Sequence, residues 1–543
     1  MSETRQLLSG DDAVALGALH AGVRLGTGYP GTPSTEILET FDRLGGQAQW
    51  SPNEKVALEV ALGAAFAGAR ALVTMKHVGL NVAADPLFTA AYTDLDGGLV
   101  VVSADDPGMA SSQNEQDNRH YARAAGVPML EPSDSQQAYD FTRLAFDLSE
   151  RWRMPVLLRL TTRVCHSKTV VHPRPPAPSA RAPAFKRDIP ARVMIPAYAK
   201  PAHHRLRTKL AEIAAWNEAE GPVRTDPGDS ALGIVSTGIS AVHAREAAPE
   251  ASHLTVAMTY PLPLERIRAF AAGVERLVVV EEGDPVLTES LRAAGIPAEG
   301  KPEMYRFGEL DVPRVRRILA GDTSPEAPPA KGKPPELCQG CAHREVFQAL
   351  RDLDCIVAGD IGCYTLGVLP PFSAMDTCVC MGAAIGVGLG LRHTLPAEQA
   401  RRVVSVIGDS TFVHSGITGI AEMVYNPPPT GHLVLILDNG TTAMTGLQEH
   451  PGTGRALDHS ATHKLSFEAL AEAMGVKNVQ VVNTTDKGLS LKDLIADLLA
   501  QDELSLLVTR QPCVLAAPKI RLYDKAAAEA ARQPGCAAAP ADA

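Results

Sequence analysis

The stretch from Val403 to Gln448 constrains the fold of this chain more than any other. It opens with a short apolar run, Val403–Ile407, of the length and β-branched content of a buried parallel strand. A Gly-Asp-Ser break follows, then helical spacing over Ser415–Tyr425, then a second apolar run, Leu433–Leu437. Strand, helix and strand in this order predict a βαβ unit. The polar residues after the two strands should therefore lie side by side at the carboxyl edge of a parallel sheet, where ligands bind.

Two candidate metal ligands stand at these strand ends. Asp409 follows the first strand and Asn439 the second, and their oxygens suit a hard divalent cation that keeps phosphate oxygens in its shell. The small neighbours Gly408, Ser410 and Gly440 would let a diphosphate approach the backbone. From these residues alone, an ordinary βαβ crossover with polar loop tips is an equally good interpretation.

The longer sequences around these positions are more specific. GDSTFVHSG and LDNGTTAMTG resemble the alpha subunit of indolepyruvate:ferredoxin oxidoreductases, within the 2-oxoacid:ferredoxin oxidoreductase superfamily. The family's thiamine diphosphate motif begins GDG, whereas this chain has Ser410 at the third position. The resemblance implies that Asp409 and Asn439 hold Mg²⁺ through their side chains and Thr441 through its backbone carbonyl. A small-residue helix expected from Gly382 would pack beneath the diphosphate, with its first amides helping to bind the anion.

The N-terminal region predicts a second parallel sheet. Helical patterns alternate there with apolar runs, which is typical of α/β folds. We expect strands at Ala71–Met75, Leu99–Ser103 and Pro155–Leu160, and helices at Asp11–Ala21 and Ala57–Ala69.

Glu54 is the candidate catalytic carboxylate of this region. It stands at the start of an apolar helix, where the simplest role for a carboxylate is to complement the helix dipole, worth ~0.3–1 kcal/mol. The surrounding segment, SPNEKVALEVALGAAFAGARALVTMKHVGLNVAADP, is similar to the family's N-terminal domain. The resemblance puts on Glu54 the role of the buried Glu that donates a hydrogen bond to N1′ of the thiamine aminopyrimidine. Burial would raise its pKa and keep that proton in place.

Thr32 is the candidate substrate contact. It lies in the Gly/Pro turn Gly26–Ser34 (GTGYPGTPS), where it could simply cap the helix that follows. In related oxidoreductases the Thr of this turn contacts the substrate's carboxylate or keto oxygen, and the resemblance implies the same for Thr32. Lys76 and His77 are weaker candidates, and the polar segment Asp105–Arg119 predicts an ordered active-site or interface loop.

Four cysteines are candidates for an iron–sulfur cluster. Cys338 and Cys341 form one CxxC, and a zinc ribbon would need a second at suitable spacing. The resemblance adds Cys363 in GDIGCYTLG and Cys513 in RQPCVLA, and so implies a [4Fe–4S] cluster held by four thiolates. The alternative is scattered thiols, some buried as small hydrophobes. We expect structural or incidental roles for the other five of the nine, Cys165, Cys355, Cys378, Cys380 and Cys536.

Composition excludes several other classes of protein. Hydrophobic residues make up 45% and charged residues 21% of the 543, as in soluble globular proteins. No run approaches the ~20 apolar residues of a membrane span, and the N-terminus lacks a signal pattern. The net charge of −11 argues against general nucleic-acid binding. We expect a cytoplasmic protein with no membrane or nucleic-acid partner.

The expected class is α/β, with two thiamine diphosphate-binding-type parallel-sheet domains. TYPLPLERI and VVVEEGDP resemble the family's middle domain, which is similar to the transketolase C-terminal domain. The expected parts are the N-terminal pyrimidine-type domain 1–165, a Pro-rich connector and helix 166–227, the transketolase C-terminal-like domain 228–322, a linker 323–335, the diphosphate- and Mg²⁺-binding domain 336–518, and an Ala-rich tail 519–543.

The resemblance also implies a function. It implies oxidative decarboxylation of aryl 2-oxoacids of the indolepyruvate or phenylpyruvate class, with coenzyme A taking the acyl group and electrons passing to the cluster. It further implies a second, gamma-like subunit in an (αβ)₂ assembly. Two alternatives stay open: a non-oxidative thiamine-dependent decarboxylase, which would not use the four cysteines, and a redox scaffold that has lost thiamine chemistry.

The electron acceptor is the point where this sequence departs from the family. Many alpha subunits continue past the equivalent of Pro518 into a ferredoxin-like domain with CxxCxxC motifs, whereas this sequence continues as an Ala-rich tail with one cysteine. We expect electrons to leave through a partner subunit, or directly from the proximal cluster to ferredoxin or another acceptor.

Overall fold

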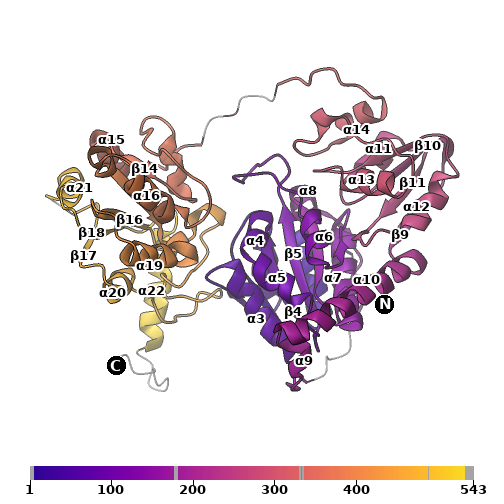
Figure 1. Ribbon diagram of the computed structural model, residues 1–543, viewed down its shortest axis with the longest axis horizontal. Helices are drawn as coiled ribbons and strands as arrows, with labels where there is room; N and C mark the ends of the chain where they lie inside the picture. The colour runs from indigo at the N-terminus through magenta and orange to yellow at the C-terminus, as the bar shows by residue number, and fades with distance from the viewer. Residues whose placement is uncertain (1–4, 177–181, 329–331, 333–334, 487, 532–543) are drawn as a thin grey trace. The chain divides into compact units, whose positions relative to one another are not determined.

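The computed structural model describes residues 5–176, 182–328, 332, 335–486 and 488–531 (Figure 1). The chain divides into two compact units, Met1–Pro328 and Pro329–Ala543, and each is treated by itself. Cys536, the end of the Ala-rich tail and part of the predicted linker lie outside the described residues. Among the described residues, no helix has the length and apolar character needed to cross a lipid bilayer.

The first unit is built on a seven-stranded sheet. Its strands are parallel except at one edge, in the order β12 (Met258–Tyr260), β6 (Met129–Leu130), β7 (Val156–Thr161), β5 (Leu99–Asp105), β4 (Ala71–Lys76), β2 (Leu25–Gly28) and β3 (Ala48–Trp50). Every residue of β4, β5 and β7 is buried, so helices must cover both faces of the sheet. The predicted parallel sheet is confirmed. The predicted turn Gly26–Ser34 begins too early, because Gly26–Gly28 form β2.

Helices follow the strands of this unit as the periodicity predicts. They are α1 (Gly10–His20), α2 (Thr35–Arg43), α3 (Glu54–Phe66), α4 (His77–Val82), α5 (Ala84–Ala90), α6 (Arg119–Ala125), α7 (Ser135–Trp152), α8 (Thr162–His166) and α9 (Ile189–Arg192). The helix predicted from Ala57 begins three residues earlier, because the Asn53 side chain caps it by accepting from the Val56 amide at 2.9 Å. Glu54 is therefore in its first turn.

The predicted connector 166–227 is less of a linker than its composition indicates. Its strand β8 (Thr169–Val171) pairs with β1 (Gln6–Leu8), and its long helix α10 (Pro196–Ala219) buries an apolar face in the core of the seven-stranded sheet. Leu206, Leu210 and Ile213 belong to that core. The apolar residues of α10, at helical spacing, therefore make this region part of the folded core despite the Pro-rich stretch before it.

The middle part of the first unit is a smaller four-stranded sheet. Its order is β13 (Leu277–Val280), β10 (Asp229–Ser236), β11 (Ala251–Val256) and β9 (Val223–Asp226), with β9 antiparallel. Around it lie α11 (Ser240–Ala247), α12 (Leu264–Ala271), α13 (Val286–Ala293), the short helix η1 (Glu303–Tyr305) and α14 (Val312–Leu319). The chain leaves this sheet after Val256 and pairs with β6 through β12.

The second unit is a five-stranded, fully parallel sheet. Its order is β14 (Ile356–Ala358), β15 (Val403–Gly408), β16 (His432–Asp438), β18 (Leu504–Arg510) and β17 (Asn478–Val482). Its helices are α15 (His343–Asp352), η2 (Cys363–Val368), α16 (Ala383–Thr394), α17 (Ala397–Ala400), α18 (Asp409–Thr411), η3 (Phe412–Gly416), α19 (Ile417–Tyr425), η4 (Ala443–Thr445), α20 (Phe467–Ala473), α21 (Leu491–Leu499) and α22 (Ala517–Ala531). The described part of the Ala-rich tail is therefore helical.

The predicted βαβ unit is confirmed, with one correction at its first turn. Neighbouring parallel strands β15 and β16 are joined through helical residues. The strand ends at Gly408 as predicted, but the helix begins at Asp409 rather than at Ser415, since helical turns run from Asp409 through a π turn at Phe412–Gly416 into α19. A carboxylate in the first turn of a helix is a favoured position, which explains why Asp409 starts the helix rather than interrupting it.

Candidate functional site

The ends of β15 and β16 bring Asp409 and Asn439 together as predicted. Asp409 Oδ1 accepts the Ser410 amide and Oδ2 accepts the Gly440 amide, each at 2.8 Å, so one carboxylate spans both strand ends. The side chain is 3% exposed, and His450 Nε2 lies 3.3 Å from Oδ2. Burial opposes ionisation, but His450 and the two amides hold the pKa of Asp409 below its usual value. The carboxylate is thus ionised and held in one orientation by its backbone contacts.

Asn439 and Thr441 complete this end of the sheet. Asn439 Oδ1 accepts the Thr441 amide at 3.1 Å, and the Thr441 hydroxyl donates to the Gln448 carbonyl at 3.2 Å. Ser410 Oγ accepts a hydrogen bond from Thr442 Oγ1 at 3.0 Å, which ties the two loops again. Side-chain and backbone oxygens from both loops therefore stand close together, a donor set that suits Mg²⁺.

Gly408 is required at the turn between strand and helix. A Cβ built on it would lie 2.5 Å from Tyr364 Cε1, closer than real side chains approach. A side chain at position 408 would therefore clash with Tyr364, so packing within the fold also requires the glycine that we expect for close backbone approach.

Gly382 does not offer its amide to an anion, contrary to expectation. Two amides at the start of α16 already donate to the Asp360 side chain. They are Gly382 N–H at 2.9 Å and Ala384 N–H at 3.0 Å. Burial raises the pKa of Asp360 to about 6. The reason is local: Asp360 follows β14 and caps the helix itself, a role the sequence pattern did not indicate. Gly382 stays a predicted cofactor contact.

The four predicted cluster cysteines line a single cavity of ≈ 80 Å³. Cys338 and Cys341 come from one chain segment and Cys363 and Cys513 from two others, and the cavity wall also includes Asn439 and His343. Burial and the neighbouring thiols raise the pKa of Cys363 to about 11. Four thiolates in one cavity repel one another, so metal ions are needed to hold them ionised. A set of four thiols around one space fits an iron–sulfur cluster.

A single-ion site for these cysteines fits less well. Among the residues that the structure describes, the only group of three or more potential ligands whose atoms all lie within 4.8 Å is Asp11, Glu36 and His166, and it includes no cysteine. The sulfur atoms are spread more widely than one zinc ion requires, as a polynuclear cluster would have them.

His343 is a residue of this region that sequence reasoning missed. It is 3% exposed, and its Nε2 lies 3.5 Å from Asn439 Nδ2. Burial lowers the pKa of His343 to about 4, so the ring is neutral. Its signal in the sequence is its place two residues after Cys341, which puts it between the cysteine cavity and the end of β16.

In the first unit, Thr32 follows β2, Glu54 follows β3 and Lys76 ends β4, and these three parallel strands are adjacent. Glu54 is 5% exposed, and Gly79 makes the room for it: a Cβ at Gly79 would lie 2.5 Å from Glu54 Oε1. The carboxyl is therefore buried at the carboxyl edge of the sheet, the environment that its predicted role requires.

Thr32 is partly buried and does not cap the next helix, because Ser34 is the residue before α2. The loop before Thr32 packs on Lys76, since a Cβ at Gly31 would lie 3.0 Å from Lys76 Cβ. Lys76 donates to the Ser111 carbonyl, and burial lowers its pKa. A hydroxyl and an ammonium group thus share this edge of the sheet.

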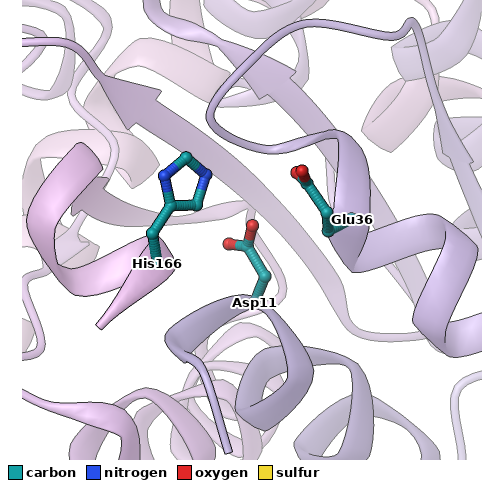
Figure 2. Close-up of side chains that lie close together, drawn as sticks. All are labelled: Asp11, Glu36 and His166. Atoms are coloured by element: carbon teal, nitrogen blue, oxygen red, sulfur yellow. The ribbon is translucent and has the colours of Figure 1, made fainter. Parts of the chain in front are cut away.

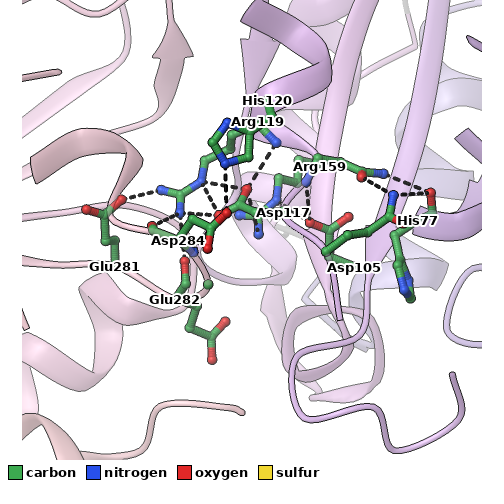
Figure 3. Close-up of polar contacts among 12 residues, drawn as sticks. His77, Asp105, Asp117, Arg119, His120, Arg159, Glu281, Glu282 and Asp284 are labelled. Atoms are coloured by element: carbon green, nitrogen blue, oxygen red, sulfur yellow. Dashed lines mark hydrogen bonds and ion pairs between the residues drawn. The ribbon is translucent and has the colours of Figure 1, made fainter. Parts of the chain in front are cut away.

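The loop predicted over Asp105–Arg119 forms an interface within the first unit (Figure 3). Arg119 donates to Asp117 and, at 2.6 Å, to Glu281 of the middle sheet. Arg159 donates to Asp105 at 2.7 Å. Burial alone would raise the pKa of Asp117, but the two guanidinium groups hold it well below its usual value. This buried ionic network joins the two sheets, and its two arginines had no sequence signal.

Comparisons with known proteins agree with this geometry. The family model described as pyruvate flavodoxin/ferredoxin oxidoreductase, thiamine diP-bdg, matches residues 16–216, and the model for the C-terminal TPP binding domain of thiamine pyrophosphate enzymes matches residues 360–509. The two matches contain Glu54 with Thr32 and Asp409 with Asn439, respectively. Thiamine diphosphate is thus the supported cofactor.

Full-length relatives extend the match. Indolepyruvate oxidoreductase subunit IorA of Archaeoglobus fulgidus is 37% identical over 94% of this chain and 86% of its own length. The subunit of the same name from Methanothermobacter thermautotrophicus is 38% identical over 95% of this chain and 88% of its own length. A solved 2-oxoglutarate:ferredoxin oxidoreductase from Magnetococcus marinus has a TM-score of 0.49 at 17% identity, over 59% of this chain and 65% of that one. By its identity to the IorA subunits over nearly its whole length, this chain belongs to the indolepyruvate oxidoreductase alpha-subunit family of thiamine diphosphate-dependent 2-oxoacid oxidoreductases.

Proposed function

We propose that this chain carries out the oxidative decarboxylation of aryl 2-oxoacids of the indolepyruvate or phenylpyruvate class. Coenzyme A takes the acyl group, CO₂ leaves, and two electrons pass through a [4Fe–4S] cluster to ferredoxin or another acceptor. The observation that carries this proposal is the cavity of four cysteines whose wall includes Asn439. A redox centre there would adjoin the predicted metal site, as one-electron oxidation requires.

The metal end of the cofactor would be held in the second unit. Asp409 and Asn439 would bind Mg²⁺ by side-chain oxygens and Thr441 by its carbonyl, with Gly408 and Ser410 allowing the diphosphate close to the backbone. The buried contacts of Asp409 with the Ser410 and Gly440 amides fix its orientation before the ion arrives.

The reactive end would depend on the first unit. Bound thiamine diphosphate supplies the electron sink for decarboxylation of a 2-oxoacid. Glu54 would hold a proton at N1′ of the aminopyrimidine, and its side chain is buried at the carboxyl edge of the sheet, where this role would place it. Thr32 would bind the substrate's carboxylate or keto oxygen, with Lys76 nearby as a second, cationic contact.

The partner proteins follow from the same proposal. The chain would pair with a gamma-like subunit in an (αβ)₂ assembly, as the subunit names of its relatives suggest. Cys338, Cys341, Cys363 and Cys513 would ligate the cluster, and electrons would leave it through that partner or directly to the acceptor.

Iron and acid-labile sulfide content of anaerobically purified protein tests the oxidative assignment. We expect about four iron per chain, and Cys363→Ser should lower the iron content and abolish 2-oxoacid-dependent reduction of a viologen dye. Cys355→Ser is the matched control, because Cys355 is equally part-buried but does not line the cavity. Iron-free protein that releases an aldehyde from the 2-oxoacid would instead establish the non-oxidative decarboxylase. Full turnover by Glu54→Ala would refute the thiamine mechanism altogether.

A further inference from the structure

Three potential metal ligands converge in the first unit, away from the residues assigned above (Figure 2). Asp11 is in the first turn of α1, Glu36 is in the first turn of α2, and His166 ends α8. Their ligand atoms all lie within 4.8 Å of one another. Figure 2 shows the two carboxylates and the imidazole ring turned toward one space.

Asp11 is the residue whose environment needs an explanation. It is 1% exposed, and neither Oδ1 nor Oδ2 has a nitrogen or oxygen donor as a hydrogen-bond partner among the described residues; the Cys165 thiol, a weak donor, lies beside it. It is not needed as a helix cap, because Ser9 and Asp12 already form the capping box of α1. A buried carboxylate without partners is costly, and native proteins rarely keep one unless something compensates it.

The neighbouring groups do not compensate this charge. The Glu36 carboxylate lies within 4.8 Å of Asp11 and adds a second negative charge. The adjacent Cys165 thiol is buried and supplies no positive charge. A divalent cation would neutralise the two carboxylates, and both Glu36 and His166 are exposed, which gives an ion a route in.

We propose that Asp11, Glu36 and His166 form a second metal site, for a divalent first-row transition-metal ion. Two carboxylates and one imidazole suit ions such as Mn²⁺, Fe²⁺ or Zn²⁺, which accept mixed oxygen and nitrogen ligands; Mg²⁺ and Ca²⁺ favour oxygen alone. With three protein ligands, water molecules would complete the coordination shell.

The site would also stabilise the part of the chain that carries Thr32. It would fasten the starts of α1 and α2 to the end of α8. Glu36 is only four residues from Thr32, and the intervening turn is held by bonds such as Ser34 Oγ to the Gly31 carbonyl at 2.9 Å. A bound ion would therefore steady the loop that carries Thr32. The inference does not depend on the proposed reaction.

Mn²⁺ binding to the full-length protein tests the proposal. Mn²⁺ is chosen because it is paramagnetic and, unlike Zn²⁺, has little affinity for the cysteine cavity. The background is Asp409→Asn, which disables the predicted Mg²⁺ site, so that any Mn²⁺ counted by electron paramagnetic resonance must bind elsewhere. We expect one Mn²⁺ per chain in that background, with nitrogen modulation of its signal from the imidazole.

Variants of the three ligands should identify the site. Asp11→Asn, Glu36→Gln and His166→Asn should each weaken Mn²⁺ binding by about tenfold or more, and His166→Asn should remove the nitrogen modulation. Glu39→Gln, one helical turn further along α2, is the control and should bind as the background does. Glu36 is exposed, so its variant remains informative even if Asp11→Asn folds poorly.

A thermal readout separates ligation from folding. Mn²⁺ should raise the melting temperature of the background protein and leave that of the Glu36→Gln variant unchanged. Absence of bound Mn²⁺ in the background, or binding that Glu36→Gln and His166→Asn do not weaken, would overturn the proposal.

Discussion

An alanine at Gly79 should disable the Glu54 carboxyl without changing its chemistry. Gly79 lies in α4 and is not one of the glycines with a positive φ, so alanine suits its backbone. The added Cβ would lie 2.5 Å from Glu54 Oε1 and 2.8 Å from Glu54 Cγ. Because the contact is with the carboxyl itself, the side chain must move from its native position.

The two free-energy terms for this substitution are of opposite sign. Gly→Ala within a helix stabilises by up to ~1 kcal/mol, and overpacking a filled site costs ~1–3 kcal/mol. The net loss of stability should be at most about 3 kcal/mol, within the stability of a typical domain, so the protein should stay folded. A displaced catalytic carboxyl, in contrast, should lower turnover by about a hundredfold, the usual effect of a misplacement near 1 Å.

The assay is 2-oxoacid-dependent viologen reduction, with calorimetric binding of thiamine diphosphate beside it. Turnover should fall while the cofactor still binds, since the diphosphate contacts are predicted elsewhere. Gly63→Ala is the matched control: Gly63 lies in α3 with Glu54, and nothing stands within 4 Å of its added Cβ. That variant should keep full activity.

A double-mutant cycle completes the test. If Gly79→Ala acts through Glu54, it should add nothing to the loss already caused by Glu54→Ala. The reasoning is refuted if folded Gly79→Ala protein turns over like the unmodified enzyme, or if the two losses multiply.

Two further predictions concern stability. Arg119→Met should destabilise the first unit by about 3–5 kcal/mol, because it removes a guanidinium partner from the buried Asp117 and Glu281 carboxylates; an unchanged denaturation midpoint would contradict this. His432 is buried in the second unit, and burial lowers its pKa from 6.5 to about 3. Between these two pH values the unfolded chain binds more protons than the folded one. Stability is therefore lost as the pH falls below 6.5. At pH 5 the loss of stability is about 2 kcal/mol, measured by thermal melts. His432→Gln, which keeps a donor for Ser405, should not show this loss.

Local patterns in the sequence were sufficient to predict much of the metal end of the site. The apolar runs before Asp409 and Asn439 determine two neighbouring parallel strands, and parallel strands necessarily place their carboxyl ends together. The positions of Glu54 and Thr32 after strands of the first sheet follow in the same way. The grouping of Cys338 with Cys513 did not follow from spacing, since it was implied by the family resemblance.

Other features depend on contacts between residues far apart in the chain, which local periodicity does not encode. Arg119 meets Glu281 across 162 positions, and β12 leaves the middle sheet for the edge of the first. The same holds for the Asp360 carboxylate that occupies the Gly382 amide.

The sequence by itself therefore determined the two parallel sheets and the residues at their carboxyl edges, because hydrophobic period and strand order act locally. Only the tertiary structure decided which buried charges face each other. The Asp11 cluster is one case, since its three residues carry no motif and meet only when α1, α2 and α8 pack together. The energy of a buried charge depends on its neighbours in space, and those neighbours are set by packing rather than by spacing along the chain.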